Sequence, residues 1–293
     1  MDLTKEIKKI DLHVHPHFPG GPERLRGGTW PTPEETRAEF DKLNIESGVI
    51  MSRYAPERMH DPITSRDAQA LHEQYPELFP WWFCALDPRM AWNDTRLVPD
   101  YSYYIDFYRE RGARGVGEVQ ANIYFDDPRM LALIHHCDKK KFPITVHFGN
   151  LGRGCGPSAD ENLVRLERVL DEYPNLTLLG HAKFLEYFTE TDEGGGVKEG
   201  RISKLMRKFP NLICDISAGS GYDALSYNLE FTYRFIEEFS DRIVFATDIS
   251  GPESIIIAGK ISALIDDGYR TGNISTVAYR RICRENALRI LND

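Results

Sequence analysis

The chain has 293 residues, of which 41% are hydrophobic and 11% aromatic, so it can bury a sizeable core and is not expected to be disordered. Its formal net charge of −9 argues against a basic surface for nucleic acid or anionic membranes, but not against a small anionic ligand. The 5 cysteines show no CxxC spacing, no apolar leader starts the chain and no run of about 18 apolar residues occurs, so we expect a cytoplasmic protein with reduced thiols.

The first predicted strand covers residues 8–14, KKIDLHV, and is followed directly by a second histidine. Apolar and polar residues alternate along it, with Ile10, Leu12 and Val14 set against Asp11, His13 and His15. Because residues two apart on a strand point the same way, the pattern predicts one apolar face and one face carrying both histidines. Two neighbouring imidazoles are half of a metal site. His17 lies just beyond, before a proline and two glycines, and is expected in a loop.

The later elements alternate between strands and helices. A helix is predicted after Thr32, because the residues TPEE combine an N-cap, an early proline and a capping box. Strands are predicted at residues 47–52, 79–86, 113–119, 143–148, 176–181, 211–217 and 242–248. Amphipathic helical stretches such as 161–173 lie between them, and several end in a proline that precedes the next strand. The polar, glycine-rich segment 189–200 is interpreted as a flexible loop after the sixth strand.

Eight strands alternating with helices predict an α/β fold, a (β/α)8 TIM barrel that forms a single domain over residues 1–293. A doubly wound open sheet is the alternative. A dinucleotide-binding sheet of that kind would carry GxGxxG after its first strand. The glycine-rich segments 19–28 and 149–157 both lack that spacing, which favours the barrel.

Polar residues stand at the ends of five predicted strands. They are His13 and His15, Glu118, His147, His181 and Asp248. In a barrel these ends meet on one face, where active sites are built. Taken singly, each has a simpler explanation: a core histidine, a helix cap at Asp248, or an ion pair between Glu118 and Arg114. Together they favour a shared divalent cation, because a buried carboxylate without a partner is costly.

Six short segments, DLHVH, GEV, TVHFG, LLGHA, VFATD and ENALRIL, together resemble the amidohydrolase superfamily from residue 10 to about 291. Within it the chain is most similar to the amidohydrolase-related, metal-dependent TIM-barrel hydrolases. The resemblance implies that His13, His15, His147 and Asp248 hold the metal, and that His181 binds a second metal or polarises the substrate. Many members carry a modified lysine on strand four, where this chain has Glu118, so either one or two ions are implied.

The ligand set favours zinc, with manganese or iron next, because it combines imidazoles and carboxylates without a thiolate. A metal of this kind activates water for attack on a carbonyl carbon. Asp248 is then the candidate for proton transfer and His181 for polarising the carbonyl. Contacts to the substrate are expected from loops at Arg53, Arg153 and Lys183, which suit a carboxylate, and at Tyr54, which suits an apolar wall.

The predicted function is a metal-dependent hydrolase that cleaves an ester, lactone or amide bond of a small carboxylate-bearing metabolite. Two alternatives remain open: a metal-dependent, non-oxidative decarboxylase of an unsaturated or aromatic acid, and a non-catalytic binding protein on the same fold. The expected partner is a small-molecule substrate, without nucleic acid or membrane. The sequence leaves open whether the chain forms a homo-oligomer.

Overall fold

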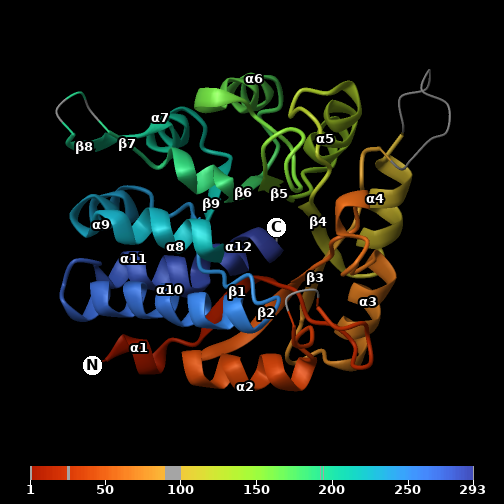
Figure 1. Ribbon diagram of the computed structural model, residues 1–293, viewed down its shortest axis with the longest axis horizontal. Coiled ribbons are helices and arrows are strands. Elements are labelled where there is room, and N and C mark those ends of the chain that lie inside the picture. The colour runs from red at the N-terminus through yellow and green to blue at the C-terminus, as the bar shows by residue number, and fades with distance from the viewer. Residues whose placement is uncertain (1, 25–26, 90–99, 192, 194, 293) are drawn as a thin grey trace.

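The computed structural model describes residues 2–24, 27–89, 100–191, 193 and 195–292. Eight parallel strands form a single sheet that curls into a nearly closed barrel, with helices around it (Figure 1). In sheet order the strands are β1 (Lys9–Val14), β2 (Ile45–Met51), β3 (Trp81–Cys84), β4 (Ala113–Val119), β5 (Ile144–Phe148), β6 (Leu178–Ala182), β9 (Leu212–Asp215) and β10 (Ile243–Val244). The predicted single-domain (β/α)8 barrel is confirmed, and each strand falls within or beside its expected range.

Helices precede the first strand, fill the connections between strands and follow the last strand. They are α1 (Leu3–Glu6), α2 (Pro33–Leu43), α3 (Ser65–Gln74), α4 (Ser102–Arg109), α5 (Pro128–Lys140), α6 (Val164–Glu172), α7 (Arg201–Lys208), α8 (Ala218–Tyr227), α9 (Leu229–Glu238), α10 (Pro252–Arg270), α11 (Thr276–Arg280) and α12 (Asn286–Asn292). Short 3-10 turns at Pro56–Arg58, Glu161–Leu163 and Lys183–Tyr187 follow β2, β5 and β6. The capping box predicted at Thr32 is present, since the Thr32 and Glu35 side chains each accept the other residue's backbone N–H. None of the helices in the described ranges is long and apolar enough to cross a lipid bilayer.

The core has two layers, one between the barrel and its helices and one inside the barrel. The inner layer combines strand residues such as Leu12 and Phe83 with Ile290 of α12, which lies near the centre of the ring of helices in Figure 1. The C-terminal helical segment contacts the end of the barrel where the strands begin. Arg284, just before α12, donates to the carbonyl of Lys8 in front of β1, and Arg289 of α12 donates to the carbonyl of Asp241 in front of β10. This end of the barrel is therefore covered, and the opposite end is left for the polar residues at the strand ends.

A register shift interrupts β1 between Asp11 and Val14. Leu12 belongs to the inner layer and Val14 to the outer one, so the prediction that they share a face is wrong. A bulge adds one residue to a strand and reverses the alternation beyond it, which turns His13 and His15 inward. Asp11 supports the bulge, because its Oδ1 accepts the backbone N–H of His13 at 3.0 Å and that of Thr247 at 2.9 Å.

The barrel closes between β1 and the residues around the end of β10. Backbone N–H groups donate to carbonyls across this seam from Leu12 to Phe245 (3.1 Å), from Asp248 to His13 (2.9 Å) and from His15 to Ile249 (3.0 Å). Few residues form regular β-ladder pairs here, so β10 has 2 residues, whereas the sequence predicted a strand over 242–248. The seam nevertheless joins two of the predicted metal ligands, His13 and Asp248, by a direct backbone hydrogen bond.

The segment 189–200 differs from its prediction as a flexible loop. Its two arms form an antiparallel pair, β7 (Thr189–Thr191) and β8 (Val197–Glu199), while residues 192 and 194 lie outside the described ranges. The threonines and the valine of these arms have high strand propensity, whereas the glycines between them suggested a loop. The hairpin projects beyond the helical ring in Figure 1, away from the barrel axis.

Candidate metal centre

The six side chains predicted at the strand ends meet at the end of the barrel where the strands finish. Nε2 of His13 and Nε2 of His15 lie 3.0 Å apart. Oε2 of Glu118 lies 3.6 Å from the first of these atoms and 3.4 Å from the second. His147 and His181 are direct neighbours in the register of β5 and β6.

In three of the histidines the Nδ1 atom, which faces away from the cluster, is hydrogen-bonded to another residue of the protein. Nδ1 of His13 lies 2.7 Å from Oδ2 of Asp215, and Nδ1 of His15 donates to the Met51 carbonyl at 2.8 Å. Nδ1 of His181 lies 2.9 Å from Oγ of Ser217. The partners of His13 and His15 can only accept, so they place a proton on Nδ1 and turn Nε2 inward, while the Ser217 hydroxyl orients the His181 ring.

The inward nitrogens of the three histidines face one another and the carboxylates of Glu118 and Asp248. Nε2 of His181 is buried and has no hydrogen-bond partner among the described residues. Two imidazole lone pairs facing each other at 3.0 Å, as in His13 and His15, repel unless a proton or a cation lies between them. The donor set of imidazole nitrogens with carboxylates nearby is the one that zinc and related ions take. The residues present therefore fit a divalent ion.

Two overlapping groups of ligand atoms have the compactness of a metal site. His13, His15 and Asp248 form one, and His13, Glu118 and His181 form the other; within each group the ligand atoms lie within 4.8 Å of one another. Asp248 approaches His15 most closely, with Oδ1 3.3 Å from Nε2. Because Nε2 of His13 can bind only one ion, the two groups either hold one ion together or hold two ions of which one is bound by His13.

His147 stands at the edge of the cluster and belongs to neither group. Its Nδ1 lies 2.5 Å from Oε1 of Glu118, and its side chain remains 21% exposed. It is thus accessible from the opening and contacts the rest of the cluster through Glu118. Asp248 is similarly accessible, with 20% of its side chain exposed, whereas His13, His15, Glu118 and His181 are buried.

The cluster has strong internal electrostatics. Burial opposes a charge on His13, but the carboxylates of Asp215 and Glu118 outweigh it and raise the pKa of His13 well above its usual value. Burial also opposes a charge on His147, and there Glu118 raises the pKa to about 10. Both carboxylates of the cluster stay ionised against burial, because the surrounding histidines hold the pKa of Glu118 well below its usual range and lower that of Asp248 to about 2.

Asp215 is a residue that the sequence analysis missed. It ends β9, is fully buried, and has its second oxygen bonded to the backbone N–H of Ser217 at 2.9 Å. Burial would raise the pKa of Asp215, but His181 and His13 outweigh it and keep the carboxylate ionised. The signal was present, because Asp215 follows an apolar run as the other strand-end residues do. The strand predicted over 211–217 extended beyond Asp215, which disguised it as an interior position.

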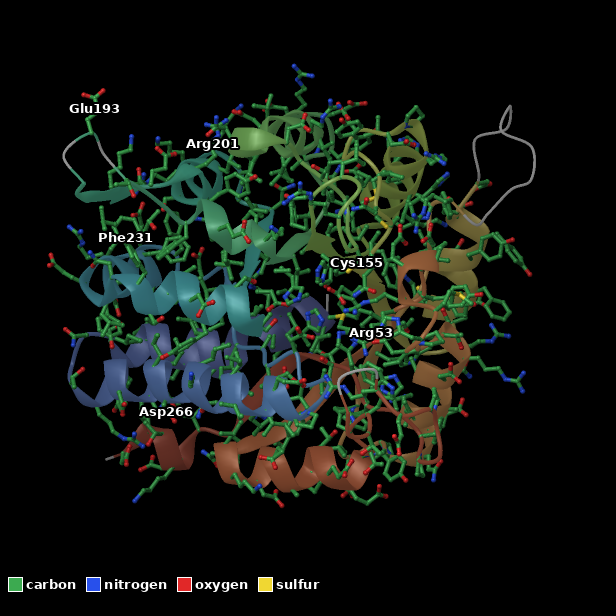
Figure 2. All side chains as sticks on the ribbon, viewed as in Figure 1. Arg53, Cys155, Glu193, Arg201, Phe231 and Asp266 are labelled. Atoms are coloured by element: carbon green, nitrogen blue, oxygen red, sulfur yellow. The ribbon has the colours of Figure 1, made fainter. Side chains whose placement is uncertain are left out.

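The four residues expected to contact substrate lie outside the cluster. Arg53 is 1% exposed, and its Nη2 lies 2.6 Å from Oδ2 of Asp61. Lys183 pairs with Glu186 three residues later at 3.3 Å. Arg153 and Tyr54 are exposed on loops. In the view of Figure 2, Arg53 and Cys155 both project onto the central part of the molecule, inside the ring of helices.

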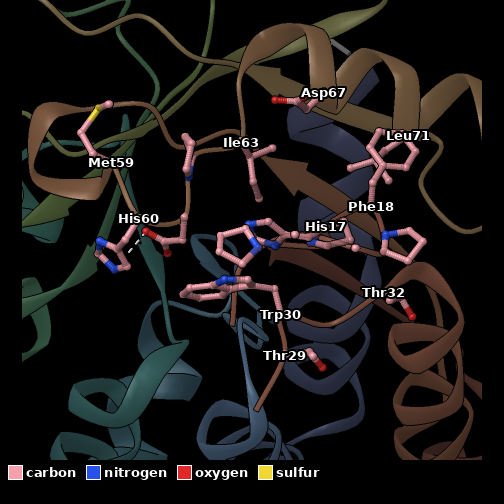
Figure 3. Close-up of a pocket in the computed structure, with 17 residues that line it drawn as sticks. His17, Phe18, Thr29, Trp30, Thr32, Met59, His60, Ile63, Asp67 and Leu71 are labelled. Atoms are coloured by element: carbon pink, nitrogen blue, oxygen red, sulfur yellow. Dashed lines mark ion pairs between the residues drawn. The ribbon is translucent and has the colours of Figure 1, made fainter. Parts of the chain in front are cut away.

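A cavity of about 510 Å³ lies between the segments that follow β1 and β2 (Figure 3). His17 and Trp30 form part of its wall, with their rings stacked at 5.1 Å between centroids. Burial and the nearby Arg53 lower the pKa of His17 to about 3, so this wall is neutral. Nδ1 of His17 lies 3.1 Å from the carbonyl oxygen of His15, which ties the cavity wall to the cluster.

Comparison with known proteins relates both the sequence and the fold to others. The sequence profile of the family described as Amidohydrolase matches residues 108–292. No curated protein sequence matches the chain significantly.

Solved structures with the same barrel cover nearly the whole chain. An uncharacterized TIM-barrel protein from Bordetella bronchiseptica has a TM-score of 0.63 and 17% identity, covering 98% of this chain and 99% of its own. A probable 2-pyrone-4,6-dicarboxylic acid hydrolase from Acinetobacter baumannii has a TM-score of 0.61 and 10% identity, covering 98% and 100%. A 2,6-dihydroxybenzoate decarboxylase from Rhizobium has a TM-score of 0.57 and 18% identity, covering 97% and 98%.

Proposed function

This chain belongs to the amidohydrolase family, and on that premise we propose that it is a metal-dependent hydrolase of a small, carboxylate-bearing metabolite. The bond cleaved is an ester, lactone or amide. The observation that carries the proposal is the inward convergence of Nε2 from His13, His15 and His181, each with its outer nitrogen held by a second residue. Such an arrangement leaves three lone pairs available to one cation.

The ligands in this proposal are His13, His15, Glu118, His181 and Asp248, with His147 at the edge beside Glu118. Imidazole and carboxylate donors without a thiolate favour zinc, with manganese or iron as substitutes. A divalent ion held here would act as a Lewis acid that polarises a carbonyl and lets water ionise near neutral pH. One ion or two are both compatible with the ligand groups.

The proposed roles of the side chains in catalysis follow from how exposed each side chain is and what it contacts. Asp248 is ionised, partly exposed and 3.3 Å from Nε2 of His15, so it can take a proton from the reacting water and return it to the leaving group. His181 is fully buried and held by Ser217, which suits a fixed ligand or a group that orients the substrate carbonyl. Glu118 links the cluster to His147 at the opening.

Decarboxylation is the second candidate, because a barrel of the same fold is a 2,6-dihydroxybenzoate decarboxylase while another is a probable pyrone dicarboxylate hydrolase. The two reactions differ in their products. Incubation with panels of lactones, esters, amides and aromatic acids, followed for acid release and for carbon dioxide, separates them. Release of carbon dioxide without bond hydrolysis would replace the first candidate with the second.

Metal content is the direct test of the site. The purified protein is expected to hold between about one and two equivalents of a divalent transition metal by elemental analysis, or to regain them after chelation and reconstitution. Asp223→Asn, on the exposed surface of α8, should hold the same amount. A protein that binds no divalent metal under either condition would rule out both enzymatic candidates and leave a non-catalytic binding protein.

A further inference from the structure

The cationic side chains near the candidate metal centre differ in whether they are paired with a carboxylate of the protein. Arg53 is engaged by Asp61 and Lys183 by Glu186. Arg58, in the turn that follows β2, makes no ion pair with a carboxylate among the described residues. Within the described ranges, its side chain makes one hydrogen bond, from Nε to Oε1 of Gln120 at 3.2 Å. The two terminal nitrogens of its guanidinium group therefore have no partner in that part of the chain.

Gln120 connects Arg58 to the metal centre. Its side chain is buried, and its Nε2 donates to Oε2 of Glu118 at 2.6 Å. The orientation of the amide follows from its neighbours, because an ionised glutamate can only accept and an arginine can only donate. The backbone carbonyl of Gln120 accepts the N–H of Gly156, which fixes the residue to the loop after β5.

Arg58 directly precedes part of the cavity wall along the chain. The next three residues along the chain, 59–61, line the space of about 510 Å³ described above. Burial lowers the pKa of Arg58, but the surrounding Cys155, Asp61, Glu118 and Asp248 outweigh it, so the guanidinium is charged. A cation thus stands one side chain away from Glu118 and one residue before the cavity wall, with its planar terminal nitrogens available. Arginine is the side chain best shaped to bind a carboxylate through two parallel hydrogen bonds.

We propose that Arg58 binds an anionic carboxylate of the substrate, and that Gln120 is a positioning residue that holds Arg58 in register with Glu118. This inference rests on the proposed function and specifies its substrate class: a molecule with a carboxylate separate from the group that reacts at the metal. It replaces Arg53 as the expected carboxylate contact, since Arg53 is neutralised by Asp61.

A purely structural role is the competing explanation, in which Arg58 only balances the negative charge of Glu118 and Asp248. The two roles predict different binding of a carboxylate ligand and its amide. A charge-balancing arginine affects stability and metal affinity, and treats a carboxylate ligand and its amide alike. A substrate-binding arginine distinguishes the two, because only the carboxylate forms charge-assisted hydrogen bonds with it.

The test uses succinate, glutarate and adipate, each beside its own monoamide, as probes for calorimetric titration of the zinc-loaded and the metal-free protein. The wild type is expected to bind at least one dicarboxylate about 10-fold or more tightly than its monoamide, the scale of a charged hydrogen bond. Arg58→Gln should reduce that ratio to about 2-fold with unchanged zinc content. Arg58→Lys should give an intermediate ratio, because it keeps the charge but loses the planar fork.

Gln120→Glu tests the positioning role with an almost isosteric side chain. It keeps an oxygen for Arg58 but replaces the donor to Glu118 with an acceptor, so the dicarboxylate preference should fall as in Arg58→Gln. Arg66→Gln, which removes the same charge from the exposed face of α3, is the matched control and should keep the wild-type ratio. If Arg58→Gln does not fold, Arg58→Lys carries the test through its reduced ratio.

Two results would overturn the inference: a wild type with no preference in any of the three pairs, or an Arg58 variant that retains the full preference. An unchanged preference in Gln120→Glu would remove the positioning role alone. A protein that binds no metal would refute the proposed function instead, and the metal-free titrations would still report on Arg58.

Discussion

The carboxylate of Asp215 lies 2.7 Å from Nδ1 of His13, although the two residues are separated by 202 positions in the chain. This contact orients the His13 ring and leaves its Nε2 facing the rest of the cluster. The same oxygen of Asp215 lies 3.6 Å from Nδ1 of His181. It acts through His13, as carboxylates behind metal-binding histidines do.

We therefore expect Asp215→Asn to weaken metal binding by roughly 10-fold to 100-fold, because the amide no longer carries the charge that holds the His13 tautomer. Competition with a chelator of known affinity measures this change. Asp223→Asn, on the exposed surface of α8, is the control with the same chemical substitution. Equal zinc affinity in Asp215→Asn and the wild type would show that His13 needs no support from Asp215.

Asp248→Asn should separate metal binding from turnover. The amide preserves the size of the side chain but cannot hold a transferred proton, so turnover should fall by roughly 10²-fold to 10⁴-fold. Metal content should fall less, since three imidazoles remain. His13→Ala should lose metal and activity together, because His13 belongs to both ligand groups. Near wild-type turnover in Asp248→Asn would assign proton transfer to another residue.

Asp11→Ala should lower the free energy of unfolding by about 2–5 kcal/mol, because it leaves buried donors of His13 and Thr247 without an acceptor. Urea unfolding of the metal-free protein measures this loss directly. Asp41→Ala on the exposed side of α2 should change stability by less than about 0.5 kcal/mol. If both variants unfold at the same urea concentration, the bulge in β1 does not depend on Asp11.

The ion pair between Glu57 and Arg89 should make stability depend on acid pH. Two oxygens of Glu57 accept from the guanidinium at 2.5 and 2.7 Å, and this contact lowers the pKa of Glu57 below 4.5. A lowered pKa means that the stabilisation is present above 4.5 and is lost as the pH falls through the folded-state value. The stability difference between the wild type and Glu57→Gln should therefore shrink between about pH 6 and pH 3.

The control for this measurement is Glu77→Gln, whose side chain is exposed near the end of α3. Its stability difference from the wild type should stay small across the same range. A Glu57→Gln difference that is constant with pH would show that the pair with Arg89 does not depend on ionisation of Glu57.

The barrel and the convergence of polar side chains were accessible from the sequence for one physical reason. Parallel strands in a barrel all finish on the same face, so a polar residue after each apolar run can be placed there without knowing any distance. His181 is an example, because its position depends only on the end of its own strand. The same reasoning would have included Asp215 if the end of β9 had been placed correctly.

Contacts between distant segments were not accessible in this way. Arg53 looked like a free cation because nothing in the sequence shows that Asp61 folds back onto it. The bulge in β1 was hidden, since a plain alternation explains the same letters. Arg58 was overlooked because it is connected to Glu118 only through hydrogen bonds to Gln120. These three residues come from the ends of two different strands, and the sequence does not show that they lie together.

The seam between β1 and the end of β10 also has a consequence for biosynthesis. A ribosome makes His13 long before Asp248, yet the backbone of one bonds the other. A nascent chain that has not yet released residue 248 therefore lacks the closed barrel and the candidate group of His13, His15 and Asp248. Closure of the barrel is therefore expected to follow the release of residue 248 from the ribosome, and until then the strand that carries His13 and His15 has an unpaired edge at this seam.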